Sequence, residues 1–172
     1  MSSFGERLAK LSDRLYDQMR HRDAYTAARG EATAHGFDAL RGHKYCLLVT
    51  YRRSGDAVPT PVWFGLDAEG RVYVRTEADA AKVRRIRADP RALVAPASAR
   101  GKPLGPLAEG TARVLGVEEH TRAESALRAN YGLGRKIYEG LATGPLGVPT
   151  TYLEVTPAQP ARDWSGSGAA PV

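Results

Sequence analysis

Three segments rich in β-branched and aromatic residues, joined by two short turns, constrain the fold of this chain more than any other feature. Residues 45–51, 58–66 and 71–76 are typical of strands, and residues 54–56 and 67–70 carry the Asp and Gly of tight turns. Connections this short join neighbouring antiparallel strands. The sequence therefore predicts a three-stranded antiparallel meander in the middle of the chain.

The residues after this meander predict a crossover helix and three more strands. Residues 79–87 place Ala80, Val83 and Ile86 on one helical face, and Pro90 ends the helix. Further strands are expected at residues 91–96, 107–117 and 150–155, and further helices at residues 118–131 and around Ile137. This order predicts a mainly β protein with helices (α+β). Its strands are expected to form a small six-stranded antiparallel β-barrel, with a helix that crosses over after the third strand.

Helical spacing also appears near the start of the chain, in the apolar residues Phe4, Leu8, Leu11, Leu15 and Met19. They predict an amphipathic helix over residues 6–19, followed at residues 24–37 by a second short helix or a loop. Residues after Pro157 are rich in Ala, Pro, Gly and Ser, which is typical of a flexible tail. We therefore divide the chain into an N-terminal helical extension (1–42), the barrel (43–157) and a tail (158–172).

Charge and composition narrow the classes of partner. The 172 residues suit one domain, and 25 Lys and Arg against 19 Asp and Glu give a net charge of +6. This excess favours an anionic partner such as nucleic acid, anionic lipid or a phosphorylated cofactor, although a basic soluble surface would also account for it. The sequence has no apolar run long enough for a membrane helix and starts without a signal core, so we expect a cytoplasmic protein.

Recognisable catalytic motifs are absent from the sequence. It contains no serine-hydrolase elbow, complete dinucleotide fingerprint or phosphate-binding loop motif. Cys46 is the only cysteine and the four histidines are scattered, so neither a disulfide nor a metal site is expected. We assign no catalytic residue and expect the chemistry to come from a cofactor.

One basic segment has the features of a phosphate seat. Thr76 ends a predicted strand and Lys82 lies in the first turn of the next helix, where free N–H groups and the helix dipole favour anions. Arg84, Arg85 and Arg87 follow it. The segment could equally be a solvated helix face or a nucleic-acid patch. Aromatic residues do not interleave with these basic residues, so recognition of single strands by base stacking is not supported, and we regard nucleic acid as an unlikely partner.

The second informative segment, residues 58–64, carries prolines at alternate positions. Pro59 and Pro61 cannot donate to a strand ladder, which favours an edge strand or a strand facing a ligand. Exposed backbone there could meet the polar edge of a flat ring. An edge strand with its aromatic residues packed in the core would explain the same pattern.

Read together, these segments resemble the split β-barrel flavoproteins of the pyridoxamine-phosphate oxidase class, and most closely the branch of deazaflavin (coenzyme F420) dependent oxidoreductases of actinobacteria. The resemblance covers about residues 45–155, and its order and spacing are more specific than any single motif. It rests on Thr60-Pro61-Val62-Trp63-Phe64, Tyr73-Val74-Arg75-Thr76-Glu77, the run from Lys82 to Arg91, Arg100-Gly101-Lys102-Pro103 and Glu109-Gly110-Thr111-Ala112-Arg113.

The resemblance implies a barrel of the FMN-binding split-barrel type and a homodimer with cofactor clefts between its subunits. In the oxidase branch a Thr and a Ser-Arg-Lys triplet hold the phosphate. Thr76 and Lys82 keep the outer positions here, whereas Ala80 and Ala81 replace the Ser and Arg. This loss argues against tight binding of riboflavin phosphate and is compatible with a deazaflavin, whose polyanionic tail would suit the positive charge. The C-terminal Arg and His cluster expected for pyridoxamine-phosphate oxidation is absent.

By resemblance, then, we expect a reductase that passes a hydride from reduced F420 to a small electrophilic acceptor such as an enone or a quinone. Alternatives are an FMN- or haem-binding barrel, or a non-enzymatic binder of a cofactor or nucleic acid. Tyr131 and Tyr138 are the candidate proton donors, and Arg84 is a candidate for an additional contact. The expected cofactor-binding residues are Thr60, Pro61, Val62, Trp63, Arg75, Thr76, Ala81, Lys82, Arg100, Gly101 and Pro103.

Overall fold

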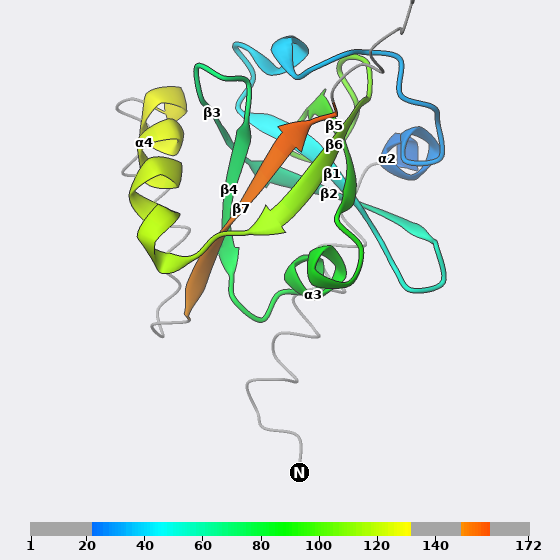
Figure 1. Cartoon of the computed structure of the whole chain (residues 1–172). Coiled ribbons are helices and arrows are strands. Elements are labelled where there is room, and N and C mark those ends of the chain that lie inside the picture. Colours follow the sequence, from blue (N-terminus) through cyan, green and yellow to red (C-terminus); the bar gives the residue numbers. More distant parts are fainter. Residues whose placement is uncertain (1–21, 132–148, 159–172) are drawn as a thin grey trace, which may run out of the picture.

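A seven-stranded antiparallel sheet, curled into a barrel, forms the body of the protein (Figure 1). The computed structural model describes residues 22–131 and 149–158. The strands are β1 (Tyr45–Tyr51), β2 (Ala57–Trp63), β3 (Gly65–Leu66), β4 (Val72–Glu77), β5 (Arg91–Ala97), β6 (Ala108–Val114) and β7 (Thr150–Pro157). The helices are α2 (Arg22–Ala27), α3 (Ala81–Ala88) and α4 (His120–Tyr131), with 3₁₀ turns η1 (Asp38–Leu40) and η2 (Val117–Glu119). The sheet order is β2-β1-β5-β6-β7-β4-β3.

The barrel closes because one stretch of chain contributes to both edges of the sheet. Strand β2 pairs with β1 at one edge, and after Phe64 the chain continues as β3, which pairs with β4 at the other edge. The prediction of one continuous strand over residues 58–66 is therefore wrong, and the strand count is seven rather than six. Both backbone groups of Phe64 leave the ladder: its N–H donates to the Tyr131 hydroxyl and its carbonyl accepts from the Asn130 side chain. The predicted antiparallel barrel with a helix after the third segment is confirmed.

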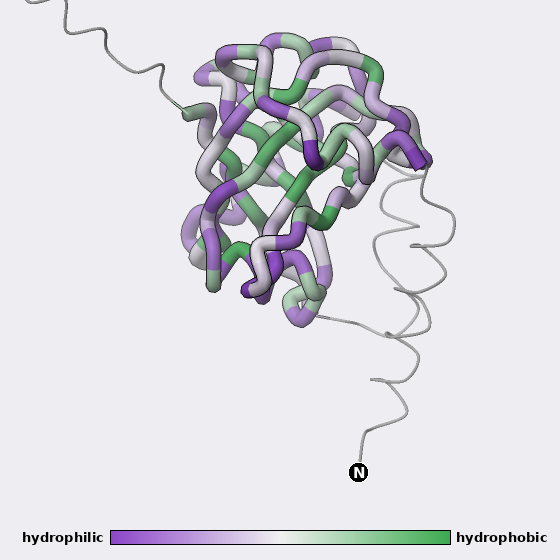
Figure 2. Tube along the Cα trace, turned by 90° about the vertical axis from the view of Figure 1, so that its right-hand side faces the viewer, coloured by the Kyte–Doolittle hydropathy of each residue, from purple (hydrophilic) through white to green (hydrophobic). Residues whose placement is uncertain are grey.

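The strands bury side chains on both faces. The main core fills the barrel and includes Leu48, Val74, Val94 and Leu153. On the outside, α2 covers an apolar cluster on β1 and β5, and α4 covers a second cluster on β4 and β7. Figure 2 shows hydrophobic stretches crossing the middle of the body and many of the hydrophilic ones along its outline. This two-sided burial explains why β1 and β5 are almost continuously apolar in sequence.

Helix α3 closes one end of the barrel. Val83 and Ile86, two of the three apolar residues predicted to face inward, lie in the main core. The helix begins at Ala81, two residues later than predicted, because Ala80 keeps an extended conformation (ψ 144°) as the N-cap residue. The short predicted helix or loop at residues 24–37 contains α2, and the predicted helix over 118–131 consists of η2 followed by α4.

Some sequence-based expectations lie outside the described residues: the helix over residues 6–19, the helix near Ile137 and the tail beyond residue 158. The division into extension, barrel and tail stays a prediction, and Phe37 and Leu40 contribute to the main core although they precede residue 43. Among the described helices, none has the length and apolar character needed to cross a membrane.

Candidate functional site

Strands β2 and β4 lie near each other without a ladder between them, along a region that we call the seam: residues 58–62 of β2 and 74–77 of β4. Strand β3 pairs with β4 only at Val72 and Tyr73, so in the described part of the chain the rest of β4 has a ladder partner on the β7 side alone. Within the same described residues, strand β2 pairs with β1 alone. The edge position predicted from the prolines is thus confirmed, and because prolines have no N–H, their ring nitrogens face away from β1.

At the α3 end of the seam, a lysine and a threonine meet. Lys82 donates a hydrogen bond from its Nζ to Thr76 Oγ1 at 2.8 Å, so the structure brings these two predicted residues together. Thr76 shares the inward face of β4 with Val72 and Val74. The N-cap residue, Ala80, provides no side-chain hydrogen bond to the first turn of α3. The ammonium of Lys82, the hydroxyl of Thr76 and the start of α3, which has no side-chain cap, therefore lie together. Groups of these kinds bind phosphate in proteins.

A second cation of α3 also bonds to a strand threonine. Arg85 donates from Nε to Thr50 Oγ1 at 2.7 Å, and Thr50 is fully buried at the end of β1. Sequence reasoning missed this contact because it grouped Arg85 with Arg84 and Arg87, which are exposed. The i, i+3 spacing from Lys82 was the available signal, since it places both cations on one helical face.

The loop between β5 and β6 reaches the outer face of β2. Gly101 has φ +81°, and a Cβ built there would lie 3.5 Å from the ring of Pro61 and 3.5 Å from Leu47 Cδ1. The structure thus brings Gly101 against Pro61, and the positive φ explains why glycine occupies the position. Arg100 is exposed next to it, whereas Pro103 is held in an isolated bridge with Ala97.

The other predicted cofactor-binding residues of β2 and α3 differ in burial and in the face on which they lie. Val62 is 8% exposed and its side chain belongs to the main core, and its register opposite Cys46, alternating with Pro61, directs its backbone groups toward β1. Thr60 and Ala81 are half-buried, at the middle of β2 and the first residue of α3. Trp63 lies on the outer face, with its ring centroid 5.1 Å from Tyr45 and 4.6 Å from Tyr131.

Arg75 is not brought together with Lys82. Neighbouring residues of a strand point to opposite faces, so Arg75 lies on the outer face with Tyr73, opposite to Thr76. Its strand partner is Tyr152, whose hydroxyl donates to Glu124 at 2.7 Å. Burial and the Glu124 carboxylate raise the pKa of Tyr152 to about 12. Arg75 Nε is buried without a hydrogen-bond partner among the described residues.

The hydroxyl of Tyr131, a candidate proton donor, has a structural role. It accepts a hydrogen bond from the N–H of Phe64 at 2.7 Å and donates its proton to the Lys44 carbonyl at 2.8 Å. The side chain is buried, at 6% exposure. A hydroxyl committed in this way is poorly placed to give its proton to a substrate. Tyr138 lies outside the described residues.

Comparison with known proteins agrees with this architecture. A family model described as pyridoxamine 5'-phosphate oxidase matches residues 33–160. No curated protein gives a significant sequence match.

Solved structures provide a likeness in fold. A conserved hypothetical protein from Mycobacterium tuberculosis is 16% identical with a TM-score of 0.52, covering 76% of this chain and 85% of that one. HutZ, a heme storage protein from Vibrio cholerae, is 14% identical with a TM-score of 0.53, covering 72% and 87%. An FAD-binding protein from Mesorhizobium loti is 14% identical with a TM-score of 0.50, covering 70% and 84%. At these identities the likeness concerns the fold alone.

Proposed function

The chain belongs to the pyridoxamine 5'-phosphate oxidase family, and from that premise we propose that it is a deazaflavin-dependent reductase. It takes coenzyme F420 and reduces a small electrophilic organic acceptor of the enone or quinone class. Hydride transfer is the chemistry that the coenzyme supplies when bound. The protein's own residues bind and orient the two reactants.

The contact between Lys82 and Thr76 is the observation that carries this proposal. It joins a cation and a hydroxyl at the start of α3, which has no side-chain cap. The edges of β2 and β4 next to it have no ladder partner across the seam within residues 22–131 and 149–158. A phosphate bound there would receive charge-assisted hydrogen bonds from Lys82. It would also receive bonds from the first N–H groups of the helix. The residues present therefore fit a phosphorylated cofactor.

Two further features favour a deazaflavin over riboflavin phosphate. Ala80 and Ala81 offer no side-chain donors in the first turn of α3, so the phosphate is held by fewer groups than in the oxidase branch. The net charge of +6 favours a ligand with a long polyanionic tail, since it raises the local concentration of anions around the protein.

The ring of the cofactor would lie along β2. The carbonyls of Pro59 and Pro61, which point away from β1, can meet the polar edge of a flat ring, and Gly101 covers the outer face beside Pro61. By family resemblance, we propose that a second copy of this chain completes the cleft in a homodimer.

Replacing Lys82 with Ala tests the phosphate seat. We expect affinity for F420 to fall by about 1–3 kcal/mol, the worth of a charge-assisted hydrogen bond at a half-buried site. Arg87→Ala is the matched control, because it removes a charge from the exposed face of the same helix. Fluorescence titration of both variants gives the two dissociation constants. Equal losses in both variants would mean that α3 acts only through its overall charge, and the assigned seat would be wrong.

A further inference from the structure

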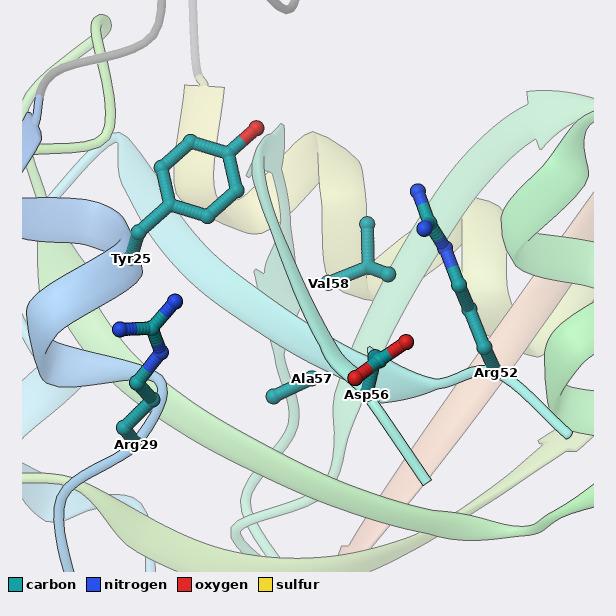
Figure 3. A pocket seen from close by; sticks show the side chains of 6 residues that line it. All are labelled: Tyr25, Arg29, Arg52, Asp56, Ala57 and Val58. Carbon is teal, nitrogen blue, oxygen red and sulfur yellow. The ribbon is translucent and has the colours of Figure 1, made fainter. Parts of the chain in front are cut away.

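A cavity of about 230 Å³ opens at the start of β2, between α2 and the β1–β2 hairpin (Figure 3). The cavity shares only Val58 with the seam, and none of its lining residues is among the expected cofactor-binding residues. Helix α2, which forms the other wall, packs against β2. The lining residues are Tyr25, Arg29, Arg52, Asp56, Ala57 and Val58.

Two arginines from separate elements line this cavity. Arg29 follows α2 and Arg52 follows β1, and Figure 3 shows their side chains on opposite sides of a space with Ala57 and Val58 between them. Some exposed arginines, such as Arg91, form ion pairs with nearby carboxylates, whereas others, such as Arg53, form none among the described residues. Neither Arg29 nor Arg52 has a carboxylate within 4.0 Å among the described residues. Their positive charge is thus open to a ligand.

The remaining walls define the rest of the ligand. Tyr25 offers an aromatic ring, 37% exposed, and Ala57 and Val58 offer aliphatic groups. Asp56 contributes one carboxylate, which accepts a hydrogen bond from Ser54 Oγ at 2.6 Å. Two guanidinium groups against one carboxylate leave a single net positive charge, and the volume suits a molecule smaller than the usual drug-sized ligand.

We propose that this cavity binds a small organic anion. Its carboxylate or phosphate group is held between Arg29 and Arg52, and its flat or apolar body lies against Tyr25 and Val58. Guanidinium groups suit both kinds of anion because they donate hydrogen bonds in a planar, paired geometry. This inference does not rest on the proposed redox function, because none of the lining residues belongs to the expected cofactor site.

Calorimetric titration of the full-length protein with benzoate and with phenyl phosphate tests the proposal. Saturable binding of either anion supports it, and their relative affinities tell which anionic group the site prefers. Benzyl alcohol, which has the ring but no charge, should not bind. Absence of binding by both anions, or equal binding of the alcohol, would overturn the proposal.

Variants locate the binding. Arg29→Ala and Arg52→Ala should each weaken it about tenfold through loss of charge-assisted hydrogen bonds. Arg53→Ala is the matched control, since Arg53 is exposed on the same hairpin but does not line the cavity, and it should change affinity little. Asp56→Asn should tighten binding because it removes the repelling carboxylate. A loss in Arg53→Ala as large as in Arg52→Ala, or a loss of binding in Lys82→Ala, would contradict the assignment to this cavity.

Discussion

Replacing Tyr131 with Phe removes the hydroxyl that ties the bend between β2 and β3 to helix α4. Two backbone groups then lose their partner, the buried N–H of Phe64 and the carbonyl of Lys44. An unsatisfied buried N–H costs about 1–3 kcal/mol, whereas water can replace the bond to the carbonyl of the exposed Lys44. We therefore expect the free energy of unfolding to fall by about 1–3 kcal/mol and the midpoint of thermal unfolding by roughly 3–10 °C.

Urea unfolding followed by circular dichroism measures this change. Tyr45→Phe is the matched control, because the ring of Tyr45 also contacts Trp63 but its hydroxyl makes no hydrogen bond in residues 22–131 and 149–158. It should alter the unfolding free energy by less than about 0.5 kcal/mol. If Tyr131→Phe were as stable as the parent protein and had lost only its turnover, the hydroxyl would be a proton donor and the structural role would be refuted.

Two other predictions concern the closure of the barrel and its acid stability. Gly65→Ala should destabilise the protein by about 3 kcal/mol in thermal unfolding, because a Cβ there would lie 2.4 Å from backbone atoms of Ala126 and Leu127. A change below about 0.5 kcal/mol would contradict this prediction, since it would mean that α4 moves away from the added methyl group at almost no energetic cost. Although burial acts in the opposite direction, hydrogen bonds from the Arg71 N–H and the Tyr73 hydroxyl lower the pKa of Asp67 below its usual 3.8. Its ionisation therefore stabilises the fold above the unfolded-state pKa and ceases to do so as pH falls through the folded-state pKa. The stability advantage over Asp67→Asn, measured by urea unfolding, should be constant above about pH 5 and shrink below about pH 4, and a pH-independent difference would contradict this cause.

Local patterns were sufficient to predict the strand-forming segments, because these segments are rich in β-forming side chains and most are separated by turn residues, but not the division of one segment into β2 and β3. The bend at Phe64 was missed for a physical reason. Residues on both sides of it read as one strand, and the groups that divert its backbone, Asn130 and Tyr131, lie 66 and 67 residues away in sequence. A contact over that distance leaves no trace in local periodicity.

The candidate site, like the fold, could be predicted only where its residues lie close together in sequence. Thr76 and Lys82 could be paired because a strand end and a helix start lie six residues apart. Arg75 was assigned by resemblance, although strand alternation places its side chain on the face opposite to Thr76. The choice of Thr50 as the partner of Arg85, and the placement of Arg29 and Arg52 around one cavity, depend on tertiary packing and could not be found from spacing alone.

Cofactor selectivity tests the central claim most directly. The measurement is a parallel fluorescence titration of the purified protein, freed of bound cofactor, with F420 and with riboflavin phosphate, and haem is added as a third ligand followed by absorbance. The account predicts saturable binding of F420 that is much tighter than binding of riboflavin phosphate or haem. Binding of riboflavin phosphate or haem without F420 would contradict it, and so would the failure of all three to bind.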